Sequence, residues 1–161
     1  MKITRLKTNR ISNPLGFELG TPRLSYVATD TTAIKQIAAQ IQVSLDETIT
    51  RVVFDSGKSE QIDSLAYELP IPLTPKTRYY WRVKVWADNG DEAISDIAWF
   101  ETAKLQEAWN ADWITPNLDK TIHPAISTEF SLSKAVKSAR AYVCGLGLYE
   151  MEINGGKAGE E

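Results

Sequence analysis

One stretch decides the fold: Tyr79-Tyr80-Trp81-Arg82-Val83-Lys84-Val85-Trp86-Ala87. Its odd-numbered positions hold only apolar or aromatic side chains, whereas its even-numbered positions include two charged ones. Successive side chains of a β-strand point to opposite faces of a sheet, so this alternation predicts a strand with one buried face. Asp88-Asn89-Gly90-Asp91 follows directly, and an Asn-Gly pair adopts the positive φ values of a tight turn at little cost. We therefore predict a hairpin whose returning strand covers residues 97–102.

Further strands are predicted in the first two thirds of the chain. Residues 37–45 alternate between a mostly polar face and an apolar face, which consists of Ile37, Ala39, Ile41, Val43 and Leu45. Residues 23–28 alternate more weakly, and residues 52–54 form a short apolar run that ends in the turn sequence Asp55-Ser56-Gly57. No long amphipathic helix is expected. Short strands at this spacing, separated by turns, are typical of an all-β sandwich rather than of βαβ units.

Composition and charge exclude several classes of protein. The chain of 161 residues is 43% hydrophobic, which is enough apolar material for a packed core. Its net charge of −3 argues against a nucleic-acid partner, which would require a basic face. No apolar run approaches the roughly 18–20 residues of a membrane span, and the N-terminal residues lack the apolar region of a signal peptide. We therefore expect a cytoplasmic chain with no membrane contact.

A second β module is predicted after a boundary near residues 104–110, so the two domains are expected to cover residues 1–104 and 105–161. Residues 126–132, 139–144 and 148–153 read as strands. Asn154-Gly155-Gly156 reads as a hairpin turn whose partner strand would begin at Lys157, close to Glu161. We therefore expect an incomplete, truncated second module with an open strand edge, through which two copies could dimerise.

The segment Leu73-Thr74-Pro75-Lys76-Thr77-Arg78-Tyr79 resembles the fibronectin type III pattern, in which such a corner leads into a strand of alternating valines. The resemblance implies an immunoglobulin- or fibronectin III-like β-sandwich. It also implies that Tyr79 is the corner tyrosine, whose hydroxyl group bonds to a nearby backbone group. Tyr26 occupies the position where that family usually has a core tryptophan, a departure that exchanges one large aromatic residue for another.

A series of short motifs resembles, in its order and spacing, the N-terminal region of bacterial α-L-rhamnosidases. The motifs are Asn13-Pro14-Leu15-Gly16, residues 22–26, Phe54-Asp55-Ser56-Gly57, residues 79–83, Trp99-Phe100-Glu101-Thr102, Trp113-Ile114 and residues 145–155. The resemblance implies a glycoside hydrolase in which fibronectin-like and β-sandwich modules precede an (α/α) barrel, and the barrel cleaves terminal α-L-rhamnose by an inverting route. The catalytic domain of the same parent chain would then be the partner of this segment, and rhamnose-containing glycosides would be candidate ligands.

No catalytic, cofactor-binding or metal-binding residue is predicted here, because none of that barrel is present. Glycosidases need two carboxylates about 5–10 Å apart, but most acidic residues of this chain fall in turns, where Asp is favoured because it bonds to the backbone. One histidine, His123, and one cysteine, Cys144, cannot form a zinc site. We expect Cys144 to be a buried or half-buried thiol, and Gly145 and Gly147 to permit a bend or bulge in a strand.

Four aromatic residues are candidate contact residues: Tyr80, Trp86, Trp109 and Trp113. Tyr80 and Trp86 share the polar face of the strand at residues 79–87. On such a face an aromatic ring can stack on a sugar, stack with neighbouring guanidinium groups in a cation–π ladder, or pack against an adjacent domain. Trp109 and Trp113 lie at the predicted junction, where they are expected to wedge the two modules together or, alternatively, to contact a sugar.

Three functions follow from these observations. The first is a non-catalytic accessory segment of an α-L-rhamnosidase-like glycoside hydrolase. The second is a carbohydrate-binding module that acts alone, which the five tryptophans favour. The third is a protein-interaction or spacer module, because a sandwich fold does not by itself determine a function.

Overall fold

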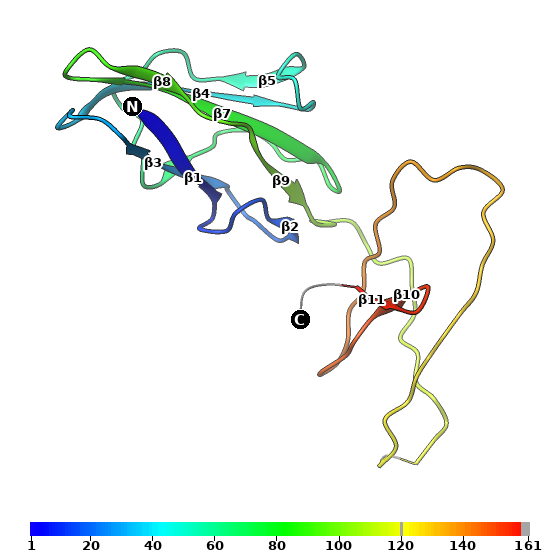
Figure 1. Ribbon diagram of the computed structural model, residues 1–161. Coiled ribbons are helices and arrows are strands. Elements are labelled where there is room, and N and C mark those ends of the chain that lie inside the picture. Colours follow the sequence, from blue (N-terminus) through cyan, green and yellow to red (C-terminus); the bar gives the residue numbers. More distant parts are fainter. Residues whose placement is uncertain (120, 159–161) are drawn as a thin grey trace. The chain divides into compact units, whose positions relative to one another are not determined.

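The strand predicted at residues 79–87 is the longest strand of the computed structural model, which describes residues 1–119 and 121–158 (Figure 1). This strand is β7 (Arg78–Ala87), and every second side chain along its whole length is buried, beginning with Tyr79. The predicted alternation is therefore confirmed. The chain divides into two units, Met1–Asp112 and Trp113–Glu161.

The first unit consists of two β-sheets. The smaller sheet is antiparallel and has the order β1-β3-β6, with bounds Lys2–Thr8, Arg23–Thr29 and Tyr67–Glu68. The larger sheet has the order β2-β9-β7-β4-β5, with bounds Leu15–Phe17, Ala98–Thr102, Arg78–Ala87, Gln36–Ser44 and Val52–Asp55. A short strand, β8 (Glu92–Ile94), pairs with the end of β7. β2 runs parallel to β9, whereas the other pairs are antiparallel.

The core of the first unit lies between the two sheets. Its largest fully buried side chains include Trp81, Phe100, Leu24, Ile41 and Leu69, and they come from both sheets and the loop after β6. This arrangement confirms the all-β, immunoglobulin-like sandwich. Among the described residues there is no helix, and hence none long and apolar enough to cross a membrane.

The corner before β7 has the predicted hydrogen bond. The backbone N–H of Thr74 donates to the hydroxyl oxygen of Tyr79 over 2.9 Å. The Tyr79 ring is buried and stacks on Phe100, with 5.1 Å between the ring centroids. Tyr26, in the other sheet, is also buried and donates its hydroxyl proton to Gln36. Both tyrosines therefore combine an apolar ring contact with a satisfied polar end.

Strand β4 departs from the prediction at its first residues. Ile37 was expected on the buried face, but it is 44% exposed, whereas Ala38 is buried. The cause is a shift in the register with β7 between Gln36 and Ala38, which inserts one extra residue into β4. Alternation with the apolar side chains inward begins only at Ala39.

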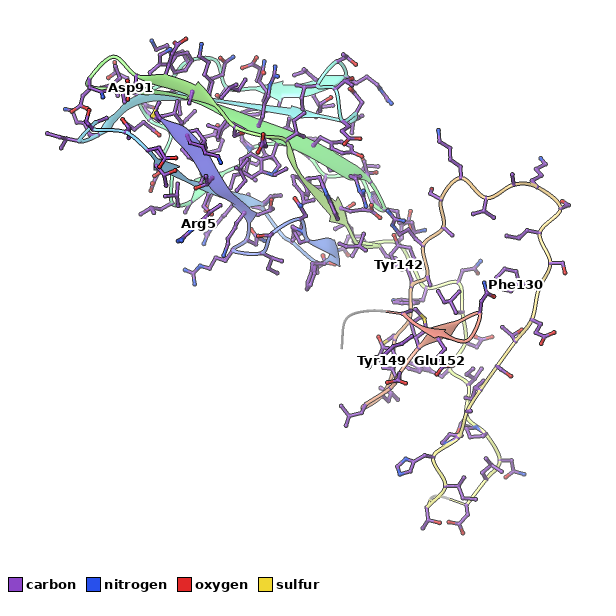
Figure 2. All side chains as sticks on the ribbon, viewed as in Figure 1. Arg5, Asp91, Phe130, Tyr142, Tyr149 and Glu152 are labelled. Carbon is purple, nitrogen blue, oxygen red and sulfur yellow. The ribbon has the colours of Figure 1, made fainter. Side chains whose placement is uncertain are left out.

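The second unit contains little regular structure. The strands predicted at residues 126–132 and 139–144 are wrong, because these residues pair with no neighbour and form no strand. Side chains such as Phe130 and Tyr149 project from extended backbone and are more than half exposed (Figure 2). A lone extended segment has no partner for its backbone groups and no covered face, so its alternation alone does not produce a strand.

The predicted hairpin around Asn154 and Gly155 is present, but its first strand covers only two of the residues predicted at 148–153. β10 (Glu152–Ile153) pairs with β11 (Gly156–Lys157), so the returning strand exists and starts at Gly156. Asn154 and Gly155 form the turn with φ values of 52° and 75°. Cys144 was expected to be at least half-buried and is instead exposed, because no core surrounds it.

The chain bends at Leu146 and Gly147, as the glycines indicated, although the bend lies outside any strand. At Gly145, an added Cβ would lie 2.5 Å from the Tyr149 ring, so any larger residue here would require that exposed ring to shift.

Candidate functional site

The candidate site is the outer face of the larger sheet along β7, which we call the β7 outer face. The side chains that β7 sends to this face are all half-buried: Arg78, Tyr80, Arg82, Lys84 and Trp86. Residues of the neighbouring strands β4, β5, β8 and β9 flank them. Because side chains on one face of adjacent strands stand close together, these groups form an extended polar and aromatic layer.

Trp86 lies under two ammonium groups. The Lys58 and Lys84 nitrogens lie 4.5 Å and 4.9 Å from the centroid of the Trp86 ring. Lys84 also pairs with Glu92 of β8 over 3.2 Å, and this hydrogen bond holds the pKa of Glu92 below its usual value. The geometry at Trp86 is a cation–π arrangement, but its cations are lysine ammonium groups rather than the guanidinium groups that the sequence suggested.

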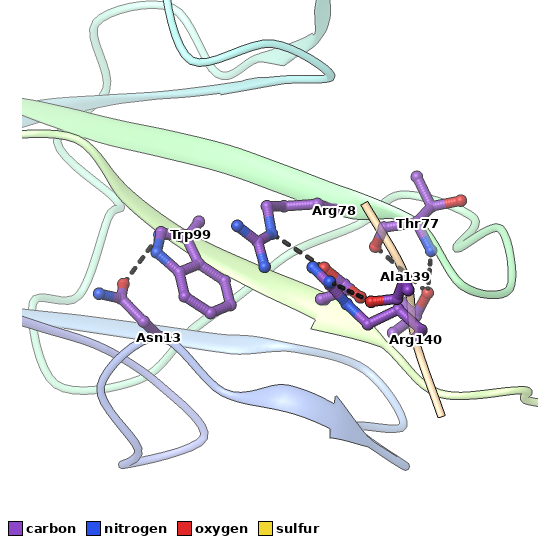
Figure 3. Close-up of polar contacts among 8 residues, drawn as sticks. Asn13, Thr77, Arg78, Trp99, Ala139 and Arg140 are labelled. Atoms are coloured by element: carbon purple, nitrogen blue, oxygen red, sulfur yellow. Dashed lines mark hydrogen bonds and ion pairs between the residues drawn. The ribbon is translucent and has the colours of Figure 1, made fainter. Parts of the chain in front are cut away.

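A second cation–π contact lies at the other end of β7 (Figure 3). The Arg78 guanidinium carbon lies 3.9 Å from the Trp99 ring centroid, and Arg78 Nε donates to Glu101 over 2.9 Å. The Trp99 backbone N–H donates to the side-chain oxygen of Asn13, which ties the loop before β2 to β9. Tyr80 pairs in register with Trp99, so its side chain stands beside this cluster.

The middle of the β7 outer face is a chain of hydrogen bonds. Arg82 donates to Gln42 over 2.9 Å, and Gln42 and Gln40 each donate to one carboxylate oxygen of Asp55 over 2.8 Å. Burial tends to raise the pKa of Asp55, but the hydrogen bonds from Gln40 and Gln42 outweigh it, so the pKa is lower than usual. Asp55 is therefore a stable anion at neutral pH.

Three more acidic groups with a lowered pKa, at residues 46, 91 and 119, lie in turns or loops and bond to neighbouring polar groups. Asp46 accepts hydrogen bonds from the Thr48 hydroxyl and from the backbone of Thr48, Thr50 and Arg51. The hydroxyl bond is the main cause of its strongly lowered pKa. The pKa values of Asp91 and Asp119 are lowered in the same way, by hydrogen bonds from threonine hydroxyl groups. These contacts are the backbone and turn roles that the sequence indicated.

Trp109 and Trp113 are far more exposed than the aromatic residues of the β7 outer face. Trp109 is 52% exposed and lies 5.3 Å from the Lys104 nitrogen, and Trp113 is 68% exposed. Trp109 belongs to the first unit and Trp113 to the second. Their expected wedging between modules stays a prediction.

Sequence reasoning did not place the two residues that complete the cation–π contacts of the β7 outer face, Lys58 and Trp99. Trp99 could have been found by pairing the predicted hairpin strands, since it lies opposite Tyr80. Lys58 follows β5 in a loop, and no local pattern indicates its contact with Trp86. Among residues 1–119 and 121–158, no group of histidine, cysteine and acidic side chains is arranged to hold a metal ion.

Comparison with known proteins matches both parts of the chain to one family. Residues 3–106 match the Rha78A-like N-terminal immunoglobulin domain, and residues 134–161 match the alpha-L-rhamnosidase N-terminal domain. The Alpha-L-rhamnosidase of Streptomyces avermitilis is 34% identical over 78% of this chain and 13% of its own length. That of Alteromonas sp. (strain LOR) is 31% identical over 96% of this chain and 19% of its own length.

Solved structures give the same result for the fold. The alpha-L-rhamnosidase from Dictyoglumus thermophilum has a TM-score of 0.62 and 32% identity, over 71% of this chain and 14% of that one. The Streptomyces avermitilis enzyme, solved with L-rhamnose, has a TM-score of 0.55 and 33% identity, over 63% of this chain and 10% of that one. The chain thus spans less than a fifth of the length of these curated relatives.

Proposed function

We propose that this chain, which belongs to the family of Rha78A-like N-terminal immunoglobulin domains, is a non-catalytic accessory segment of an enzyme that releases terminal α-L-rhamnose. The observation that carries the proposal is the match of residues 3–106 to that domain. Relatives several times longer than the chain contain the same region as a small part. The partner of the segment would be the catalytic domain of such a polypeptide.

The charges of the first unit support an accessory role. A glycosidase needs a carboxylic acid that stays protonated near neutral pH, which requires a raised pKa. On the β7 outer face, the pKa values of Asp55 and Glu92 are instead shifted downward. Amide groups hold the Asp55 carboxylate in place, and an ammonium group holds that of Glu92. Such a fixed polar surface suits an accessory role.

An activity assay tests this proposal directly. The chain is incubated with p-nitrophenyl α-L-rhamnoside beside the Streptomyces avermitilis relative as a positive control. We expect release of nitrophenol by the relative and none by the chain. Turnover by the chain that survives repeated purification and is lost on unfolding would overturn the non-catalytic assignment.

Sugar binding is the second candidate function, and the exposure of Trp109 and Trp113 favours it. Trp86 is a weaker candidate for stacking, because Lys58 and Lys84 already lie over its ring. Tryptophan fluorescence is followed while L-rhamnose is added to millimolar concentration. A saturable change that is lost in Trp113→Phe and kept in Trp86→Phe would establish binding at the exposed ring. No change in any of the proteins would remove this candidate.

A further inference from the structure

We propose that Asn154 is a site of spontaneous deamidation, and that the second Asn-Gly pair of the chain, Asn89-Gly90, is protected by its hydrogen bonds. Both pairs lie in exposed hairpin turns, at Asn89 with Gly90 and at Asn154 with Gly155. Exposure and local sequence therefore predict the same deamidation rate for the two Asn-Gly pairs. The difference lies in what holds the two reacting groups, the side-chain amide and the following backbone nitrogen.

The reaction balances without any external reagent except water. The backbone nitrogen of the glycine loses its proton and attacks the side-chain carbonyl carbon of the asparagine. The new N–C bond closes a succinimide ring, the bond from that carbon to Nδ2 breaks, and the nitrogen leaves as ammonia with the transferred proton. Water then opens either carbonyl of the ring, which gives aspartate or isoaspartate. Glycine permits this attack because no Cβ obstructs the approach.

The Asn89 turn holds both groups. The Asn89 amide nitrogen donates to Thr32 over 3.2 Å and to Asp91 over 3.0 Å, and its oxygen accepts from the Asp91 backbone over 2.9 Å. The nucleophile, the Gly90 nitrogen, donates to the Ala87 carbonyl over 3.1 Å. Ring closure at this turn therefore requires these bonds to break, and the turn is anchored on the long strand β7.

The Asn154 turn holds neither group. In the described part of the chain, no hydrogen bond engages the Asn154 side chain or the Gly155 nitrogen. Only two residue pairs join β10 and β11, and such a short ladder opens readily.

The products would alter the hairpin in different ways. Aspartate is compatible with a φ of 52° and adds a negative charge two residues from Glu152. Isoaspartate inserts an extra carbon into the backbone, which breaks the register that pairs Ile153 with Gly156. It would also separate Lys157 from Glu150, which lie 3.0 Å apart as an ion pair.

Peptide mapping by mass spectrometry tests the proposal on the intact chain, aged at mildly alkaline pH. We expect Asn154 to exchange its amide for a hydroxyl group at least about tenfold faster than Asn89, since the bonds at Asn89 must open first. In urea the two rates should become similar. Thr32→Ala should accelerate the deamidation of Asn89 and leave the rate at Asn154 unchanged. Tryptophan fluorescence reports whether the variant stays folded. Equal rates at the two sites in the folded chain would overturn the proposal.

Discussion

Removing the hydroxyl group of Tyr79 tests the corner that leads into β7. In Tyr79→Phe the ring keeps its stacking on Phe100, but the Thr74 N–H loses its acceptor at 2.9 Å. An unpaired N–H costs about 1–3 kcal/mol when fully buried, and this contact is partly buried, so we expect a loss of about 1–2 kcal/mol. Each kcal/mol lowers the melting temperature of a domain of about 100 residues by roughly 4–8 °C, so that loss corresponds to roughly 4–16 °C.

The assay is urea unfolding of the full chain followed by tryptophan fluorescence, because Trp81 is fully buried in the same core. The midpoint should fall by roughly 0.5–1 M with an unchanged slope. Tyr80→Phe is the matched control, since its ring lies on the β7 outer face and no described residue bonds to its hydroxyl group. We expect a change within about 0.5 kcal/mol for the control. If Tyr79→Phe is as stable as Tyr80→Phe, the corner bond does not stabilise the unit.

Three further predictions concern the same unit. Phe100→Ala removes a fully buried ring and should lower the free energy of unfolding by about 3–5 kcal/mol in the same urea assay; a loss under 1 kcal/mol would contradict the described core. The folded state lowers the pKa of Asp46. The stability that the Asp46 carboxylate contributes is therefore present above its unfolded pKa near 3.9 and is lost as the pH falls. The urea midpoint of Asp46→Asn should decline less steeply with acid than that of the parent chain. Burial raises the pKa of Tyr26 to about 12 and outweighs the effect of its hydrogen bond to Gln36. The first unit should therefore lose stability as the pH rises from about 10 toward 12. A Tyr26→Phe variant that shows the same alkaline loss would refute this cause.

The parts of the fold that local patterns could predict are those in which neighbouring residues determine the outcome. The alternation of β7, the Tyr79 corner and the Asn154-Gly155 turn each depend on a few consecutive residues, and all three are confirmed. The family could be recognised in the same way, because its motifs keep their order along the chain.

The parts that could not be predicted depend on distant partners. Ile37 is exposed because of a register shift against β7, which nothing within residues 37–45 reveals. Leu15–Phe17 gives no strand pattern of its own and becomes β2 only by pairing with β9. At the candidate site, Lys58 reaches Trp86 from a separate loop. The domain boundary near residue 104 stays a prediction.

The parallel pairing of β2 with β9 has a mechanical consequence. These strands lie near the two ends of the first unit, and the Glu101 and Ala103 nitrogens donate across the pair to Pro14 and Phe17. Tension between the ends would pull the strands past each other along their length, so the hydrogen bonds that join them would be loaded together rather than peeled apart one by one. We expect the first unit to resist stretching at forces well above those that unzip β10 from β11. Force spectroscopy in which Ala103→Pro, which removes the N–H that donates to Phe17, leaves the rupture force unchanged would refute this.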